Sequence, residues 1–258
     1  MKIEQVAVQL YTLRDFTKTA ADLATTFRRI REIGYQAAQL SAVGPIPEAE
    51  IRSMAAGEGI TLCATHEGTQ KIINEPEAVI ARLDALGIDY TAVPNFGVEL
   101  SPAKLEDVDF LIDRMEAVGA QFRAAGKGLT YHNHAIEFAR HEGETIFERI
   151  FRRTSPENLG SELDTYWVQY GGADPVAWCR KLAGRLPLLH LKDYAIGFDN
   201  TPYYTEIGQG NLDFKAIIAA AEASGCQWFI VEQDTCPGDP FDSLRISFNH
   251  IRENLVEA

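Results

Sequence analysis

Short apolar runs alternate along the chain with longer segments in which apolar residues recur at helical spacing. Each run ends in polar or ring-bearing residues, and a glycine often separates the amphipathic segment that follows from the next run. Short runs that are apolar at consecutive positions are typical of parallel strands buried on both faces. We therefore predict eight strands, at residues 6–10, 37–40, 61–65, 90–94, 129–134, 160–164, 187–192 and 228–232.

The segments between these runs carry the boundary signals of helices. A capping side chain precedes a proline at the expected first helical position in Ser101-Pro102, Asp174-Pro175 and Asp239-Pro240. Glycines stand where helices should end, at Gly34, Gly87, Gly126 and Gly225. Apolar residues also share one helical face, as in the set Leu244, Phe248, Ile251 and Leu255. Strands and helices therefore alternate along the whole chain.

This alternation predicts an α/β protein, a single (β/α)8 TIM barrel that forms one domain over residues 1–258. The 258 residues provide about 32 residues for each of the eight units, close to what such a barrel needs. An open, doubly wound sheet is the structural alternative. The two common nucleotide-binding versions of that sheet lose support because neither Gly-x-Gly-x-x-Gly nor a P-loop motif follows the first strand.

Net charge, cysteine content and the lack of a long apolar stretch limit which partners and which cellular location we expect. The net charge of −13 repels polyanions, so we expect no nucleic-acid partner. Four scattered cysteines without a Cys-x-x-Cys pair predict reduced thiols rather than disulfides or a zinc knuckle. The sequence shows neither a signal peptide at the start nor an apolar stretch of membrane-spanning length. These features favour a cytoplasmic protein without membrane contact, and they leave a homo-oligomer possible.

Two acidic residues and a histidine lie at or near the ends of the last three predicted strands. Asp164, His190 and Glu232 end three successive strands, and the carboxyl ends of barrel strands meet on one rim. One such residue alone is more often a helix cap or a packed rim residue. Together they predict a site for a divalent cation, Mn²⁺, Zn²⁺, Co²⁺ or Mg²⁺, with positions open to substrate oxygens.

Several motifs make the sequence similar to a known family. Residues 131–138 read Tyr-His-Asn-His-Ala-Ile-Glu-Phe, residues 190–193 His-Leu-Lys-Asp, and residues 206–210 Glu-Ile-Gly-Gln-Gly. The chain resembles the xylose-isomerase-like TIM-barrel superfamily, and within it the sugar phosphate isomerase/epimerase group, related to ketose 3-epimerases and inosose dehydratases. The resemblance spans nearly the whole chain and implies the same barrel fold.

The resemblance also implies a ligand set for the metal. In the superfamily a glutamate from strand five, an aspartate from strand six, a histidine from strand seven and a glutamate from strand eight hold the cation. The last three correspond to Asp164, His190 and Glu232. The strand-five position is held by His132 here, so the fourth ligand is either His132 or Glu137. We expect Glu137, which belongs to the motif, and assign His132 together with Gln9 and His66 to substrate binding.

The implied activity is that of a metal-dependent sugar isomerase/epimerase acting on a small keto-sugar or polyol-derived ketone. In this chemistry an α-proton is removed and an enediolate forms. His134, Lys192 and Glu232 are the expected catalytic residues, since histidine and a lysine with a lowered pKa serve as acids or bases. Lys192 has an alternative interpretation, an ion pair with Glu162 or a neighbouring acid. A Gly-rich phosphate cradle is absent, which favours an unphosphorylated carbohydrate.

The sequence leaves three alternative functions. A metal-dependent lyase or dehydratase shares the first step and then expels a β-hydroxyl. A nuclease similar to endonuclease IV needs more histidines than the six of this chain. A non-catalytic sugar-binding barrel is the remaining alternative.

Overall fold

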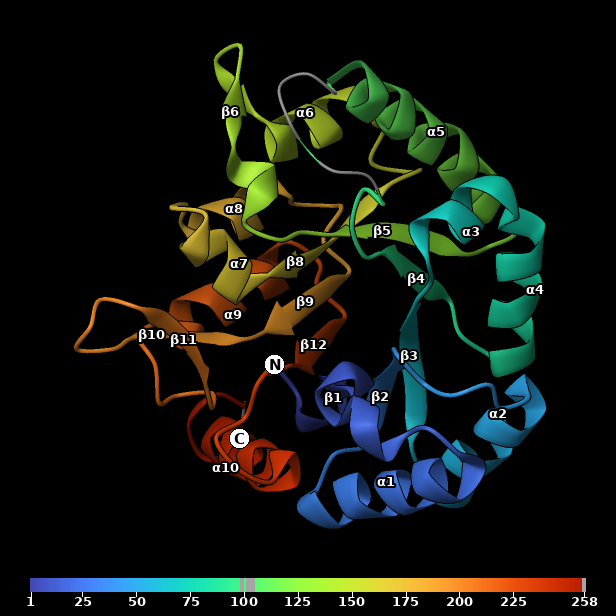
Figure 1. Cartoon of the computed structure of the whole chain (residues 1–258), viewed down its shortest axis with the longest axis vertical. Helices are drawn as coiled ribbons and strands as arrows, with labels where there is room; N and C mark the ends of the chain where they lie inside the picture. Colours follow the sequence, from blue (N-terminus) through green and yellow to red (C-terminus); the bar gives the residue numbers. More distant parts are fainter. Residues whose placement is uncertain (98–99, 101–104, 257–258) are drawn as a thin grey trace.

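Parallel strands close into a barrel surrounded by helices (Figure 1). A computed structural model of the chain describes residues 1–97, 100 and 105–256. Within these residues the barrel strands are β1 (Val6–Gln9), β2 (Ala37–Leu40), β3 (Thr61–His66), β4 (Tyr90–Val93), β5 (Gly128–His132), β8 (Gly160–Asp164), β9 (Leu188–Leu191) and β12 (Trp228–Val231). They follow one another around the barrel in chain order, as in a (β/α)8 barrel. The predicted fold class is confirmed.

All eight predicted strands are present, but several end one or two residues earlier than predicted. β5 stops at His132, β9 at Leu191 and β12 at Val231. The chain leaves the hydrogen-bonded ladder there to form the loops above the barrel. His134, Lys192 and Glu232 therefore lie just beyond strand ends, on the rim where the predicted site residues gather.

Helices connect the strands and form the outer layer of the molecule (Figure 1). The α-helices are α1 (Ala20–Ile33), α2 (Glu48–Gly57), α3 (Thr69–Asn74), α4 (Pro76–Leu86), α5 (Leu105–Ala124), α6 (Ile146–Arg153), α7 (Thr165–Tyr170), α8 (Pro175–Lys181), α9 (Phe214–Ala223) and α10 (Pro240–Asn254). Short 3-10 helices cover Ile3–Gln5 (η1), Leu10–Phe16 (η2) and Ile136–Phe138 (η4).

The predicted helix boundaries are confirmed where the structure describes them. Asp174 caps α8 by accepting a hydrogen bond from the Val176 amide, and Asp239 caps α10 in the same way through Phe241. The predicted Ser101-Pro102 cap lies outside the described residues. Gly34 and Gly87 follow α1 and α4 directly, and Gly87 adopts the left-handed conformation (φ 71°) that glycine accepts without strain.

The inside of the barrel is layered. One layer is small and apolar and consists of Ala7, Ala37, Cys63, Ala64, Leu188 and Ile230. Two residues further along the strands, on the same face, the inward side chains are polar: Gln9, Gln39, His66, His190 and Glu232. A larger apolar core fills the space between barrel and helices. The polar layer is thus supported from below by packed side chains and opens at the carboxyl ends of the strands.

Two hairpins extend the barrel loops. The β6 (Arg140–His141) and β7 (Glu144–Thr145) strands form one, and β10 (Asp193–Ile196) and β11 (Pro202–Thr205) form the other, which projects at the left in Figure 1. Asp193 anchors the residue 206–210 motif, since its carboxylate accepts hydrogen bonds from the amides of Gly208 and Gly210. The motif is therefore a turn whose glycine amides bind the Asp193 carboxylate.

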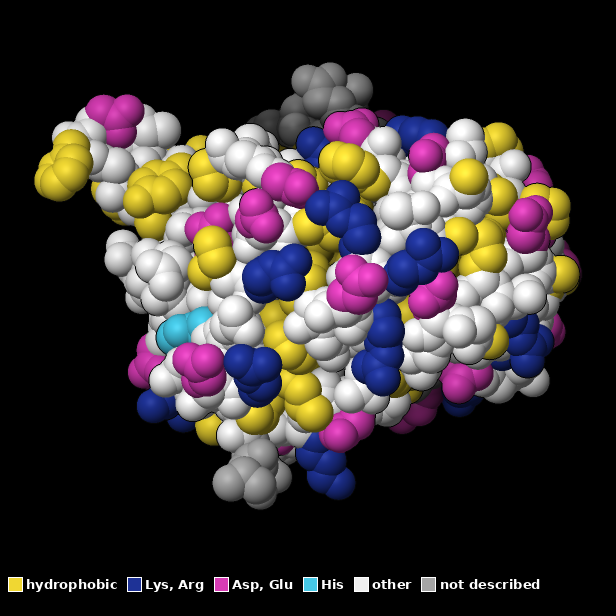
Figure 2. All heavy atoms as spheres, turned by 90° about the horizontal axis from the view of Figure 1, so that it is seen from below, with side chains coloured by type: hydrophobic (Ala, Val, Ile, Leu, Met, Phe, Trp, Pro, Cys, Tyr) yellow, Lys and Arg dark blue, Asp and Glu magenta, His cyan; other side chains and the backbone are white. Residues whose placement is uncertain are grey.

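Charged side chains of both signs are interspersed on the face shown in Figure 2. Cys63, Cys179 and Cys226 are buried and Cys236 is partly exposed, and all four are free thiols, as predicted. Among the described residues, no helix combines the length and apolar character needed to cross a membrane.

Candidate metal centre and active site

A cavity of roughly 520 Å³ opens at the carboxyl ends of the strands. Its size lies within the range of small-molecule sites. Its walls include five of the predicted site residues, His66, His132, His134, Lys192 and Glu232. Tyr11, Arg14, Tyr204 and Asp234 also line it. Barrel folding therefore brings together residues that are far apart in the sequence.

Four buried side chains at this end of the barrel have the composition of a metal site. His132, Asp164, His190 and Glu232 each offer a ligand atom, and these atoms lie within 4.8 Å of one another; we call them the ligand group. The Nδ1 atom of His190 is 2.9 Å from Glu232 Oε2 and 3.9 Å from Asp164 Oδ2. Two carboxylates and two imidazoles suit a divalent transition ion.

Two atoms of the ligand group lack the hydrogen bonds that buried polar atoms normally have. Oδ2 of Asp164 and Nδ1 of His132 are buried without a hydrogen-bond partner. Burial raises the pKa of Asp164 to about 6, with Glu232 adding to the shift and Lys192 opposing it. A divalent cation next to Oδ2 would compensate this negative charge, so the residues present fit a metal ion.

Glu137 lies away from the ligand group. Its Oε1 accepts a hydrogen bond from the Tyr131 hydroxyl at 2.7 Å, and its Oε2 accepts one from the His134 amide at 2.8 Å. Both oxygens thus stabilise the loop after β5, and burial raises the pKa of this carboxyl. We expected Glu137 as the strand-five ligand, but the geometry favours His132, the alternative that the sequence left open.

Lys192 is a buried cation among carboxylates. Its Nζ lies 2.9 Å from Asp234, 3.1 Å from Glu232 and 3.5 Å from Asp164. Burial lowers the pKa of Lys192, but these three carboxylates outweigh burial and raise it above its ordinary value. The lowered pKa expected of a basic lysine is therefore wrong. The predicted ion pair forms with Glu232 and Asp234 rather than with Glu162.

His134 lies beside Lys192 on the cavity wall. Its ring contacts Trp167 and His132, with centroids 5.3 and 5.1 Å apart. Burial lowers the pKa of His134 to about 4, and the Lys192 charge adds to the shift. The imidazole is neutral at neutral pH, the state in which it accepts a proton.

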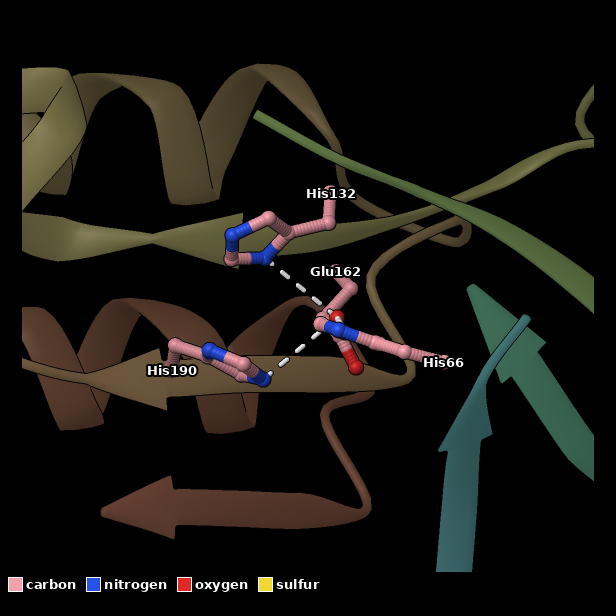
Figure 3. A group of neighbouring side chains, drawn as sticks. All are labelled: His66, His132, Glu162 and His190. Carbon is pink, nitrogen blue, oxygen red and sulfur yellow. Dashed lines mark hydrogen bonds and ion pairs between the residues drawn. The ribbon is translucent and has the colours of Figure 1, made fainter. Parts of the chain in front are cut away.

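Glu162 lies beneath the ligand group and is surrounded by three histidines (Figure 3). Its Oε2 is 2.5 Å from His66 Nε2, 3.3 Å from His132 Nδ1 and 3.4 Å from His190 Nε2. Burial raises the pKa of Glu162, but His190 and His66 outweigh burial and hold it well below its usual range. Glu162 is therefore an ionised carboxylate in the barrel interior.

One glutamine, Gln39, contacts Glu162, and a second, Gln9, contacts Gln39. Gln39 donates from Nε2 to Glu162 Oε1 at 2.5 Å, and Gln39 Oε1 lies 2.8 Å from His190 Nε2. Gln9 donates to Gln39 Oε1 at 2.9 Å and is fully buried. Of the two other residues predicted to bind substrate, His66 lines the cavity, whereas Gln9 lies below it and contacts Gln39.

Sequence reasoning missed Gln39 and Asp234 and gave Glu162 no functional part beyond a possible ion pair. A signal for each was present. Glu162 precedes Asp164 by two residues, and Asp234 follows Glu232 by two, so each shares a face with a recognised site residue. Gln39 is the polar residue in an otherwise apolar strand.

A family model agrees with this architecture over most of the chain. The model for the xylose isomerase-like TIM barrel matches residues 27–254. The chain belongs to the xylose isomerase-like TIM barrel family. The match begins within α1 and so leaves out β1, but it includes all four residues of the ligand group. The resemblance seen in the sequence is confirmed.

Among characterised relatives of this xylose isomerase-like barrel is an inosose dehydratase from Geobacillus thermodenitrificans. It is 28% identical over 165 residues, which cover 57% of this chain and 55% of the relative. The rhizopine catabolism protein MocC of Rhizobium meliloti is 26% identical over 146 residues, 51% of this chain and 43% of the relative. The chain thus spans about half the length of the curated relatives it matches.

Solved structures share the fold over the full length. A sugar phosphate isomerase/epimerase from Parabacteroides distasonis superposes with a TM-score of 0.82 at 23% identity, covering 98% of this chain and 99% of the other. At this identity the similarity establishes the barrel alone.

Proposed function

We propose that this xylose isomerase-like barrel is a metal-dependent enzyme that removes a proton next to the carbonyl of a small polyhydroxylated ketone. The observation that carries the proposal is the ligand group, which lies beside an open cavity with an unprotonated imidazole and a buried ammonium next to it. His132, Asp164, His190 and Glu232 would hold the cation. When bound, the cation polarises the substrate carbonyl and acidifies the adjacent C–H bond.

Two residues of the chain are placed to move protons. His134 lines the cavity as a neutral imidazole and serves as general base for the α-proton. Lys192 lines the same cavity as an ammonium and serves as general acid. The remaining donors and acceptors on the wall orient the hydroxyl groups of the substrate.

β-Elimination of water uses this base and acid together. His134 takes the α-proton, the electron pair of the C–H bond forms a C=C bond conjugated with the carbonyl, and the β C–O bond breaks. The departing hydroxyl takes a proton from Lys192 and leaves as water. The inosose dehydratases among the relatives support this reaction. We therefore propose a dehydratase acting on a keto-polyol.

Isomerisation or epimerisation is the second candidate. It needs proton-transferring groups on two sides of the substrate carbon. Three places separate β5 from β12 around the barrel, so His134 and Glu232 approach the cavity from different sides. This observation favours proton return to the other face if no hydroxyl leaves.

The cavity wall favours an uncharged carbohydrate. Its basic side chains that are not histidines are Arg14 and Lys192. Lys192 is neutralised by carboxylates, and Arg14 donates to the carbonyls of Tyr11 and Asp234. A phosphate would find no cluster of free cations among the described residues, whereas hydroxyl groups would find many partners.

Deuterium incorporation tests the reaction and separates the two candidates. The Mn²⁺-supplied protein is incubated in D₂O with inososes, ketoses and 3-keto-glucosides, and products are followed by mass spectrometry and proton NMR. A product lighter by one water supports the dehydratase. Deuterium next to the carbonyl without loss of water supports the isomerase/epimerase. Absence of both from the metal-loaded protein contradicts the proposed function.

A further inference from the structure

The buried network under the ligand group requires a proton on Nε2 of His190. Gln39 donates from its amide NH₂ to Glu162 Oε1 at 2.5 Å, and its own Oε1 accepts from Gln9 at 2.9 Å. The other end of that amide, Oε1, then faces Nε2 of His190 at 2.8 Å. An oxygen acceptor requires a donor opposite, so His190 carries a proton on Nε2.

Gln9 reinforces this orientation. It donates from its own NH₂ to Gln39 Oε1, and its Oε1 accepts from the Tyr11 amide. Flipping the Gln39 amide would place an NH₂ group against the NH₂ of Gln9 and an oxygen against the Glu162 carboxylate. The backbone at Tyr11 therefore fixes Gln9, Gln9 and Glu162 fix Gln39, and Gln39 fixes His190.

The consequence lies on the opposite side of the His190 ring. On that side Nδ1 faces Asp164 and Glu232 and lies 2.9 Å from Glu232 Oε2, so in the metal-free protein it donates to this carboxylate, and a cation bound there would take the place of that proton. His132 has a related arrangement, because its Nδ1 faces Glu162 at 3.3 Å and its other ring nitrogen lies on the far side (Figure 3). In each imidazole, therefore, one ring nitrogen faces Glu162 (Nε2 of His190 and Nδ1 of His132) and the other lies on the side away from Glu162.

We propose that Glu162 is a positioning residue for the metal centre: it holds His190 in the metal-binding tautomer through Gln39, and its carboxylate faces Nδ1 of His132 at 3.3 Å. Metal-bound histidines generally donate their second N–H to a carboxylate or carbonyl oxygen, and loss of that partner weakens metal binding. Here one buried carboxylate lies next to both ligand histidines. This inference rests on the proposed ligand group.

Glu162 also places a negative charge beside His132. The superfamily resemblance implies a glutamate ligand at the strand-five position, and His132 brings no charge there. Glu162 is fully buried, and its carboxylate lies 3.3 Å from His132. The chain thus has a carboxylate near the strand-five ligand position, supplied by β8 rather than by β5.

His66 offers a competing explanation, because its Nε2 makes the shortest histidine contact of Glu162, 2.5 Å. If Glu162 served only to orient His66 for substrate, metal binding would not depend on Glu162. The substitution His66→Gln removes this imidazole and leaves the ligand group and Gln39 in place. It is therefore the matched control for Glu162→Gln.

The test measures Zn²⁺ affinity by competition with a chromophoric chelator, in the wild type, Glu162→Gln, His66→Gln and Glu116→Gln. Glu116 is a carboxylate that bonds Ser155 and Asn158 away from the cavity, so its variant controls for loss of a structural carboxylate. We expect Glu162→Gln to bind Zn²⁺ about 10–100-fold more weakly, and both controls to bind like the wild type. Wild-type affinity in Glu162→Gln, or an equal loss in His66→Gln, overturns the inference and leaves the proposed function intact.

A second measurement needs no variant and stands even if Glu162→Gln does not fold. ¹⁵N NMR of histidine-labelled, Zn²⁺-loaded wild type reports which ring nitrogen carries each proton. We expect His190 protonated on Nε2 and free of a proton on Nδ1. The opposite tautomer for His190 overturns the inference. A wild-type chain that binds no Zn²⁺ overturns the ligand group and, with it, the proposed function.

Discussion

Replacing Lys192 with methionine is a sharp test of the charge arrangement in the site. Methionine has nearly the same length but no charge, so the substitution leaves Asp164, Glu232 and Asp234 facing one another without their shared cation. Removing one partner of a buried ion pair typically costs ~3–5 kcal/mol. Because the Asp234 side chain keeps 23% of its exposure and is partly screened, we expect the lower end, ~3 kcal/mol.

A loss of ~3 kcal/mol lowers the melting temperature of a chain of this size by about 6–12 °C. Thermal unfolding followed by circular dichroism in chelator-treated protein measures this shift. Lys181→Met is the control, since Lys181 pairs with Glu148 on the surface and its side chain is 56% exposed; its loss should cost less than ~1 kcal/mol. Mn²⁺ should reduce the defect of Lys192→Met, because the cation compensates the same carboxylates. A Lys192→Met protein as stable as the wild type without metal would refute this reasoning.

Three further predictions follow from the structure. The folded state lowers the pKa of His134 to about 4, so the stability that its neutral form contributes above pH ~6.5 is lost as the pH falls through 4. In urea unfolding, the free energy of unfolding of metal-free wild type should fall by up to ~3 kcal/mol relative to that of His134→Gln over this range. Equal dependence of the two unfolding free energies on pH would contradict this prediction. Thiol titration of the native protein should modify Cys236 first and the three buried cysteines only after unfolding, and rapid reaction of all four would be inconsistent with their burial. Gly119→Ala should destabilise α5 by ~1–3 kcal/mol in denaturant unfolding, because the added Cβ would meet the carbonyl of Asn158; the usual gain from alanine in a helix would be the contrary result.

The fold was predictable because its signals are local. Each barrel strand is a short apolar run, and helix starts such as Asp174 and ends such as Gly87 are recognisable from one or two residues. The rim followed from the barrel, since parallel strands point their carboxyl ends the same way. This brought Asp164, His190 and Glu232 to one place before any contact was known.

The contacts within the rim were not predictable in the same way. Glu137 and His132 both offer ligand atoms, and the choice depends on whether Tyr131 and the loop amide take the carboxylate, which only the three-dimensional arrangement decides. The pKa direction of Lys192 likewise depends on how many carboxylates surround it. Gln39 gains its importance from Glu162 and His190, two residues on distant strands.

Metal stoichiometry and affinity across three variants test the central claim of a cation held by His132, Asp164, His190 and Glu232. Metal-free protein is titrated with Mn²⁺, and binding is followed by electron paramagnetic resonance. We predict one Mn²⁺ per chain, strong weakening in His132→Ala and Asp164→Asn, and wild-type affinity in Glu137→Gln. A chain that binds no Mn²⁺, or one that loses the ion in Glu137→Gln but keeps it in His132→Ala, would contradict the account.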